Sequence, residues 1–423
     1  MDDLLFLAHR IPFPPEKGDK IRSFHILEHL ASRYRVHLGC FYDDPADAGL
    51  IDELRRRCST VMCLPLHRKR ARIRSLAALA TGRSLTETDF HDARLARWVA
   101  ETMRRYRPRS SFVFGSAMAP YALPYRQGTR IFDMVDIDSE KWGAYTGARP
   151  WPLSQLYARE RRLLFELERK AAAGFDRTLL VSRAEAKLFR RLAPDVAGRV
   201  LALRNGVDIA YFDPRLTYPQ LFSAAAVPIV FTGAMDYWPN IQAAEWFAGT
   251  VWPLLGDRDR PLEFWIVGAN PAPAIRRLAE RPGIHATGRV EDMRPYLAHA
   301  AAVVAPLRIA RGIQNKVLEA MAMAKPVVVT PEASEGILGD AQDEGRDELI
   351  VRADAAGFAQ GLKWALTEEG AGIGQRARRL VERHFQWRES WTMLDALFAA
   401  GQAQAAGGVA PETSASALEG IAR

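Results

Sequence analysis

Residues 305–329 read APLRIARGIQNKVLEAMAMAKPVVV, and they carry the clearest indication of the fold class. It starts at the end of an apolar strand, passes through a glycine-containing loop and a helix, and ends in a second apolar strand. Such a crossover belongs to a parallel sheet, where the free amides of a helix that follows a strand face the ligand crevice. We therefore expect Gly312, Ile313 and Gln314 to present amides to a phosphate, with Lys316 adding a positive charge.

The same alternation of strands and helices runs through the rest of the chain, with apolar runs for strands and three-residue apolar spacing for helices. The predicted strands are 4–8, 36–42, 60–64, 111–114, 130–135, 177–181, 228–232, 262–267, 285–287, 302–305 and 326–330. The predicted helices include 20–33, 153–173, 240–255 and 387–398. The pattern predicts an α/β protein with two doubly wound, Rossmann-like domains.

The domain boundary is expected near residues 210–226, because an Asn-Gly turn at residue 205 precedes a linker with three prolines. This division predicts one domain over residues 1–215 and a second over residues 216–385. A final helix over 386–401 is expected to return to the first domain. The tail over 402–423 is rich in Ala, Gly and Ser, so we expect it to be disordered.

Composition further narrows the classes of protein to which this chain can belong. A chain of 423 residues with 48% hydrophobic residues can bury two sizeable cores, and its net charge of +8 favours anionic partners. Its three cysteines have no metal-ligand spacing, no signal-peptide pattern opens the chain, and no apolar run reaches eighteen residues. We therefore expect a cytoplasmic protein that does not span a membrane.

Four motifs follow one another between residues 205 and 337. They are Asn205-Gly206-Val207-Asp208, Phe231-Thr232-Gly233, Gly288-Arg289-Val290-Glu291-Asp292 and Glu319-Ala320-Met321-Ala322. In this order they resemble retaining glycosyltransferases of the GT-B fold, family four. The wider pattern, over residues 3–400, is similar to the sugar transferases associated with exopolysaccharide and exosortase (PEP-CTERM) loci. It adds matches at residues 9–12, 235–240 and 312–316.

The resemblance implies two domains that face a central cleft, with the acceptor on the first and a nucleotide-sugar donor on the second. The implied donor-binding residues are Gly233, Arg289, Val290, Arg308, Gly312, Ile313, Gln314, Asn315 and Glu319. The implied catalytic residues are Lys316, Arg311, Asp136 and Asp138. Arg311 stands where the family has a first glutamate, and no basic pair follows Gly233, so the diphosphate depends on Lys316, Arg308, Arg311 and helix amides.

Glu319 follows Gly312 by two helical turns, among small and apolar neighbours. Its carboxylate either accepts hydrogen bonds from ribose hydroxyls or is a solvent-facing helix charge.

In the first half, Gly18, Asp19 and Lys20 lie between the first strand and helix. They form either a loop that faces the cleft or a surface turn before a helix.

Asp136 and Asp138 follow a predicted strand with one residue between them. Such a pair holds a divalent metal in GT-A glycosyltransferases, a rival fold that we discount because the donor motifs lie elsewhere. In the GT-B reading either aspartate orients an acceptor hydroxyl, or the pair caps the turn before the next helix. We therefore expect no metal and no cofactor apart from the donor substrate.

A basic run over residues 68–74 precedes an apolar stripe. It forms either a contact with anionic lipid at the inner face of the membrane or a solvated loop.

The function expected is transfer of a sugar to a saccharide or lipid-linked acceptor in exopolysaccharide biosynthesis, with no nucleic-acid partner. A catalytically silent nucleotide-sugar-binding or assembly protein is the alternative. A dinucleotide oxidoreductase has little support, because neither leading strand is followed by a Gly-x-Gly-x-x-Gly turn.

Overall fold

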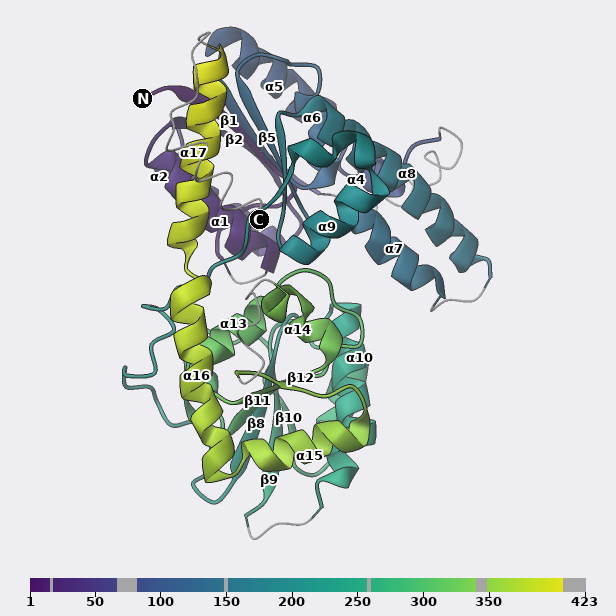
Figure 1. The fold of residues 1–423 in the computed structure, drawn as a ribbon, viewed down its shortest axis with the longest axis vertical. Coiled ribbons are helices and arrows are strands. Elements are labelled where there is room, and N and C mark those ends of the chain that lie inside the picture. Colours follow the sequence, from purple (N-terminus) through teal and green to yellow (C-terminus); the bar gives the residue numbers. More distant parts are fainter. Residues whose placement is uncertain (16–17, 67–81, 148–150, 257–259, 340–347, 406–423) are drawn as a thin grey trace. The chain divides into compact units, whose positions relative to one another are not determined.

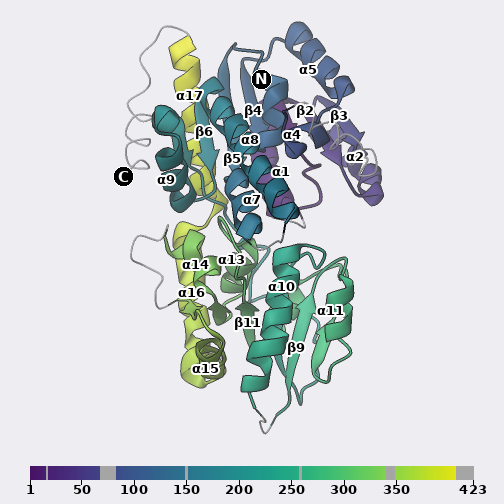
Figure 2. The same cartoon turned by 90° about the vertical axis from the view of Figure 1, so that its right-hand side faces the viewer.

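The computed structural model describes residues 1–15, 18–66, 82–147, 151–256, 260–339 and 348–405. The chain forms two compact units, Met1–Leu203 with the segment that starts at Ser390, and Arg204–Glu389. Each unit is built on one parallel sheet flanked by helices (Figures 1 and 2). The prediction of two doubly wound, Rossmann-like domains is confirmed.

The first unit contains a seven-stranded sheet. Its strands are β1 (Asp3–Ala8), β2 (Arg35–Tyr42), β3 (Thr60–Pro65), β4 (Ser110–Phe114), β5 (Thr129–Val135), β6 (Arg177–Leu180) and β7 (Val200–Ala202). They are ordered β3-β2-β1-β4-β5-β6-β7, and every neighbouring pair is parallel. The order reverses between β1 and β4, so a crevice is expected at their carboxyl ends.

Helices cover both faces of this sheet (Figure 1). They are α1 (Gly18–Ala31), α2 (Ile51–Arg57), α4 (Leu85–Asp89), α5 (Ala93–Arg105), α6 (Ala119–Ala122), α7 (Asp138–Gly147), α8 (Leu153–Gly174), α9 (Arg183–Leu192) and α17 (Trp387–Ala405). Leu4 and Phe6 of β1 join a core with α1, α2 and α17, whereas Leu5 and Leu7 join a core with α5, α6, α8 and α9. Burial on both faces explains why β1 is a continuous apolar run.

The second unit contains a six-stranded sheet and its helices. The strands are β8 (Val227–Thr232), β9 (Leu262–Val267), β10 (Ile284–Ala286), β11 (Ala302–Ala305), β12 (Val327–Val329) and β13 (Ile350–Val351). They are ordered β10-β9-β8-β11-β12-β13. The helices are α10 (Trp238–Trp246), α11 (Pro273–Leu278), α12 (Arg294–His299), α13 (Asn315–Ala322), α14 (Pro331–Leu338), α15 (Ala355–Ala365) and α16 (Glu368–His384).

Two local predictions differ from the structure. The helix expected over 240–255 ends at Trp246 and continues as a π-helical turn, Phe247–Val251, and a short 3₁₀ turn, Trp252–Leu254. Pro253 has no amide hydrogen and its ring crowds the preceding turn, so a regular α-helix cannot pass through it. The strands β7 and β13 were not predicted, because runs of three and two residues carry no periodic signal.

The boundary between the units falls after Leu203, before the expected range of 210–226. The connecting segment belongs to the second unit because its backbone is hydrogen-bonded to α16 and to Phe385, the residue after that helix. The amide of Val207 donates to the carbonyl of Phe385 over 2.8 Å, and Arg378 donates to the carbonyl of Phe212 over 2.9 Å.

The last helix differs from its expected range of 386–401, because α17 runs to Ala405 and includes residues 402–405 of the expected tail. Met393, Leu394, Leu397 and Phe398 of α17 are buried in the core of the first unit. The remaining part of the expected tail, 406–423, lies outside the described residues, as do residues 68–74 of the basic run.

Candidate functional site

The loop from β11 to α13 is the centre of the candidate donor site. β11 lies between β8 and β12, at the point where the strand order of the second sheet reverses. Gly312 has a φ of +63°, a conformation that glycine adopts without the steric cost of a side chain. Gln314 precedes the helix, and its amide group donates to the carbonyl of Arg311 over 2.9 Å instead of capping α13. The first amides of α13 therefore have no side-chain cap, which suits an anion.

Lys316 lies in the first turn of α13 and is held by residues from β8 and α10. Its Nζ donates to Oδ1 of Asn240 over 2.6 Å and lies 4.8 Å from the ring centroid of Phe231. A Cβ on Gly233 would come within 3.0 Å of this Nζ, so glycine is what allows the close approach. Burial lowers the pKa of Lys316 to about 7.

Glu319 lies one turn after Lys316 and is only 8% exposed. The interpretation of Glu319 as a solvent-facing charge is therefore wrong. Burial raises the pKa of Glu319 to about 7, while the charge of Lys316 acts in the opposite direction. Among the described residues its carboxylate has no hydrogen-bond partner, which is unusual for a buried acid and typical of a ligand site.

The other predicted donor residues lie in the same unit. Ile313 is buried, Arg308 is exposed, and Arg311 is partly exposed. Asn315 accepts a hydrogen bond from Asn205 over 2.9 Å, so two of the motifs meet. Arg289 and Val290 follow the carboxyl end of β10, the same edge of the sheet from which the β11 loop extends, because all these strands are parallel.

In the first unit, Gly18, Asp19 and Lys20 form the first turn of α1 and not a loop before it. Lys20 is 2% exposed, and its Nζ lies 2.9 Å from Oδ2 of Asp47. The expectation that Lys20 faces a ligand is corrected by this buried ion pair, which uses its charge inside the unit.

Asp136 and Asp138 lie in the turn from β5 to α7 and share one ammonium. Nζ of Lys141 is 2.9 Å from Oδ2 of Asp136 and 3.0 Å from Oδ1 of Asp138. Among the residues that the structure describes, no cluster of three His, Cys, Asp or Glu side chains is arranged to hold a metal ion. The other oxygen of Asp136, Oδ1, is buried and has no hydrogen-bond partner.

Sequence reasoning missed Lys141, Asn240 and two buried acids of α8, Glu160 and Glu168. Both acids are fully buried and lie four residues either side of buried Leu164, on the apolar face of the helix. An acid at this spacing on an apolar face is the signal that identifies them.

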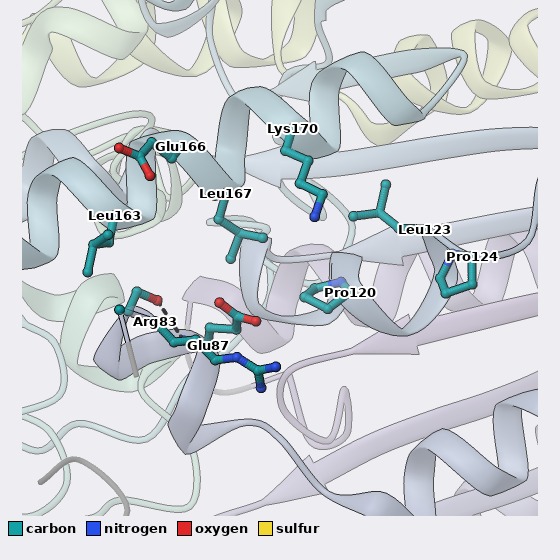
Figure 3. Close-up of a pocket in the computed structure, with 11 residues that line it drawn as sticks. Arg83, Glu87, Pro120, Leu123, Pro124, Leu163, Glu166, Leu167 and Lys170 are labelled. Atoms are coloured by element: carbon teal, nitrogen blue, oxygen red, sulfur yellow. Dashed lines mark hydrogen bonds between the residues drawn. The ribbon is translucent and has the colours of Figure 1, made fainter. Parts of the chain in front are cut away.

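A pocket of about 320 Å³ lies elsewhere in the first unit, among α4, α6 and α8. Figure 3 shows Leu167 and Lys170 pointing from α8 toward Pro120. None of the predicted site residues lines it.

Comparison with known protein families shows which family the second unit resembles. Residues 226–368 match the family described as "Glycosyl transferases group 1". This part of the chain is a glycosyltransferase domain. The matched range includes β8, which Gly233 follows, and the α13 helix with Lys316 and Glu319. The comparison with curated proteins found no match to this sequence.

Solved structures resemble almost the whole chain. Sucrose-phosphate synthase from Thermosynechococcus elongatus has a TM-score of 0.69 at 16% identity, over 94% of this chain and 98% of that one. HepE from Anabaena, in complex with UDP-glucose, has a TM-score of 0.65 at 14% identity, over 93% and 98%. Trehalose 6-phosphate synthase from Burkholderia multivorans has a TM-score of 0.63 at 12% identity, over 96% and 98%. These similarities confirm the predicted GT-B fold.

No helix among the described residues is both long and apolar enough to cross a bilayer.

Proposed function

We propose that this enzyme is a retaining glycosyltransferase that moves a sugar from a nucleoside diphosphate sugar to a saccharide or lipid-linked acceptor. One observation carries the proposal: the ammonium of Lys316 and the unbonded carboxylate of Glu319 lie one turn apart inside the glycosyltransferase domain. A base and an acid at this spacing suit the two halves of one nucleotide. Lys316 binds the diphosphate, and Glu319 accepts hydrogen bonds from the ribose hydroxyls.

The chemistry of the donor side follows from where charge develops. When the glycosidic bond to the diphosphate breaks, negative charge grows on the leaving group, and groups that stabilise this charge accelerate the step. Lys316 and the uncapped amides of α13 are suited to this task. Arg308 and Arg311 add positive charge from the same loop, where the family resemblance expects a glutamate at position 311.

On the acceptor side, Asp136 and Asp138 are proposed to orient the attacking hydroxyl. Lys141 satisfies one oxygen of each carboxylate, and Oδ1 of Asp136 has no hydrogen-bond partner. Asp138 has the more exposed side chain of the two, at 36%, so its carboxylate is the one that can accept a hydrogen bond from an acceptor hydroxyl and polarise it for attack. Gly18, at the start of α1, is the remaining backbone position proposed to approach the ligand.

The finer assignments rest on the family resemblance. Membership of family four, the retaining outcome, a role in exopolysaccharide biosynthesis and the association with exosortase loci are proposed on the quoted motifs. Metal-independent transfer is proposed because Lys316, arginines and helix amides neutralise the diphosphate. Peripheral contact with anionic lipid at the inner face of the membrane is proposed from the basic run over residues 68–74.

Calorimetric titration with a panel of UDP, GDP, dTDP and CMP sugars tests the donor site. UDP-glucose is the first probe, because HepE of similar fold was solved with it. Lys316→Ala and Glu319→Ala should each weaken binding by about ten- to a hundredfold, since a hydrogen bond to a charged group contributes about 1.5–3 kcal/mol. Lys363→Ala, an exposed lysine of α15 in the same unit, is the matched control and should bind as wild type.

The nucleoside alone separates the two roles. Glu319→Ala should weaken binding of both uridine and UDP, whereas Lys316→Ala should spare uridine. Wild-type affinities in both folded variants would refute a donor site on α13. A protein that binds sugar nucleotides but releases no free nucleotide over time would instead favour a catalytically silent binder, the alternative that Arg311 suggests.

A further inference from the structure

The turn from β5 to α7 is held by three buried carboxylates that come from three different elements. Alternate backbone amides of the turn each donate to one of them. The pairs are Val135 with Asp133 of β5 (3.2 Å), Ile137 with Glu185 of α9 (3.1 Å), and Ser139 with Glu168 of α8 (3.0 Å). The three carboxylate side chains are 0–5% exposed. A turn on the surface of a domain does not need three buried acids to satisfy its amides.

The residues between these amides form the other half of the pattern. Asp136 and Asp138 alternate with the anchored positions, and both retain exposure, at 17% and 36% of their side chains. They share the ammonium of Lys141, which is itself 29% exposed. The amides at positions 135, 137 and 139 therefore have buried partners, whereas the aspartates at positions 136 and 138 are partly exposed and share Lys141 of α7.

Glu168 makes the strongest of the three anchors. One of its oxygens accepts from the amide of Ser139, and the other accepts from the Ser139 hydroxyl over 2.5 Å. Burial raises the pKa of Glu168 to about 8, and the charge of Asp138 acts in the same direction. The two hydrogen bonds from Ser139 offset part of the cost of burying this acid, and they tie α8 to the first turn of α7.

The backbone of the turn needs such restraint. Val135 has a φ of +71°, which a β-branched residue rarely adopts, and the register between β5 and β6 shifts between Asp133 and Val135. A backbone conformation of this kind persists only where the surroundings hold it.

We propose that Glu168 is a positioning residue for the acceptor side of the reaction. Through Ser139 it fixes the first turn of α7, and with it the Asp136–Lys141–Asp138 group. This inference rests on the proposed role of the two aspartates in orienting the acceptor hydroxyl. Loss of a group that orients a metal ligand reduces activity by about 10- to 100-fold even though the group does not touch the substrate, and we expect a comparable loss here.

The test compares Glu168→Gln with Glu160→Gln. Glu160 lies on the same helix, is equally buried, and accepts three hydrogen bonds from Leu85 and Thr86 of α4, but it does not touch the turn. Loss of thermal stability should therefore occur in both variants. Ser139→Ala, which removes one donor and keeps the carboxylate, is the milder variant for use if Glu168→Gln does not fold.

The first measurement needs no substrate. Acetic anhydride labels lysines according to how freely the amine is available, and mass spectrometry reads Lys141 against Lys363 in the same sample. Labelling of Lys141 should rise about threefold in Glu168→Gln, the factor expected for loss of a partly exposed ion pair. It should not rise in Glu160→Gln. Equal labelling of Lys141 in wild type and Glu168→Gln would overturn the proposal.

The second measurement is hydrolysis of UDP-glucose, in which water takes the place of the acceptor. Glu168→Gln should lower kcat about tenfold and leave the Kd for UDP unchanged, because the donor is held by the second unit. Glu160→Gln should keep the wild-type kcat. An unchanged kcat in Glu168→Gln, or an equal loss in both variants, would overturn the positioning role. A wild-type protein that binds no sugar nucleotide would refute the proposed function, and Lys141 labelling would then decide the positioning of Lys141 by itself.

Discussion

The protonation of Lys316 predicts that donor affinity depends on pH. Burial lowers the pKa of this ammonium to about 7, and its hydrogen-bond partner Asn240 is neutral. Bound diphosphate places negative charge beside Nζ and returns the pKa toward its ordinary value of about 10.5. Above pH 7 the free protein has lost a proton that the complex holds, so binding takes up one proton and weakens as the pH rises.

The size of the effect follows from this shift. For a free pKa of about 7 and a bound pKa near 10.5, Kd increases by a factor of about 4 at pH 7.5 and about 100 at pH 9, relative to fully protonated protein. Affinity should therefore fall about 25-fold between these two values, or about 1.9 kcal/mol. The pKa of Glu319 is raised to about 7, so that group is mostly ionised across this window, and the trend reports mainly on Lys316.

Calorimetry with UDP-glucose at pH 7.5 and 9 measures this fall, since the diphosphate of a sugar nucleotide does not titrate there. Repeating the titration at pH 7.5 in Tris and in HEPES, which differ in ionisation enthalpy and contain no phosphate, counts the protons taken up. Lys316→Arg should remove most of the pH dependence, because a guanidinium stays charged, and Lys316→Ala should remove it together with the affinity. Lys363→Ala should keep the wild-type trend. Equal wild-type affinity at the two pH values, or an undiminished trend in Lys316→Ala, would refute the reasoning.

Four further predictions concern single features. Gly233→Ala places a Cβ 2.8 Å from Nδ2 of Asn240 and 3.0 Å from Nζ of Lys316, so calorimetry should show about tenfold weaker donor binding; wild-type affinity would contradict the close approach. Arg22→Met leaves Asp133 buried without its guanidinium partner, now 2.8 Å away, and denaturant unfolding should show a loss of about 3–5 kcal/mol. Sugar transfer should continue in excess chelator; activity that disappears and returns with manganese would favour a metal at the two aspartates of the β5–α7 turn. Neutralising the basic run should reduce flotation with anionic vesicles and leave UDP binding unchanged, because screened charges act locally. The changed residues are Arg68, Lys69, Arg70, Arg72 and Arg74. Equal flotation of variant and wild type would show that this segment does not bind the membrane.

Helix α13, the proposed donor helix, was predictable because its signal is local. The strand, the glycine turn and the helix of residues 305–329 lie consecutively, and β11, α13 and β12 follow the predicted pattern closely. A parallel strand followed by a helix places the intervening loop at the carboxyl edge of the sheet whatever the rest of the chain does. The same local pattern indicated Lys316 as a phosphate-binding residue, whereas the role expected for Glu319 rested on the family resemblance.

The residue pattern along the chain was therefore enough to predict the class of fold, most of its strands and the helix that we propose carries the donor site. Tertiary structure decided the state of each charge, because the deciding partners lie far apart in sequence. Asn240 meets Lys316 across 76 residues, and Arg22 meets Asp133 across 111. A lysine in a glycine-containing turn has the same local pattern whether it faces a ligand or, like Lys20, is buried against an aspartate. The desolvation and the ion pairing of a charged group depend on the atoms that pack around it, and these atoms come from segments far away in the sequence. The periodicity of one segment carries no information about them.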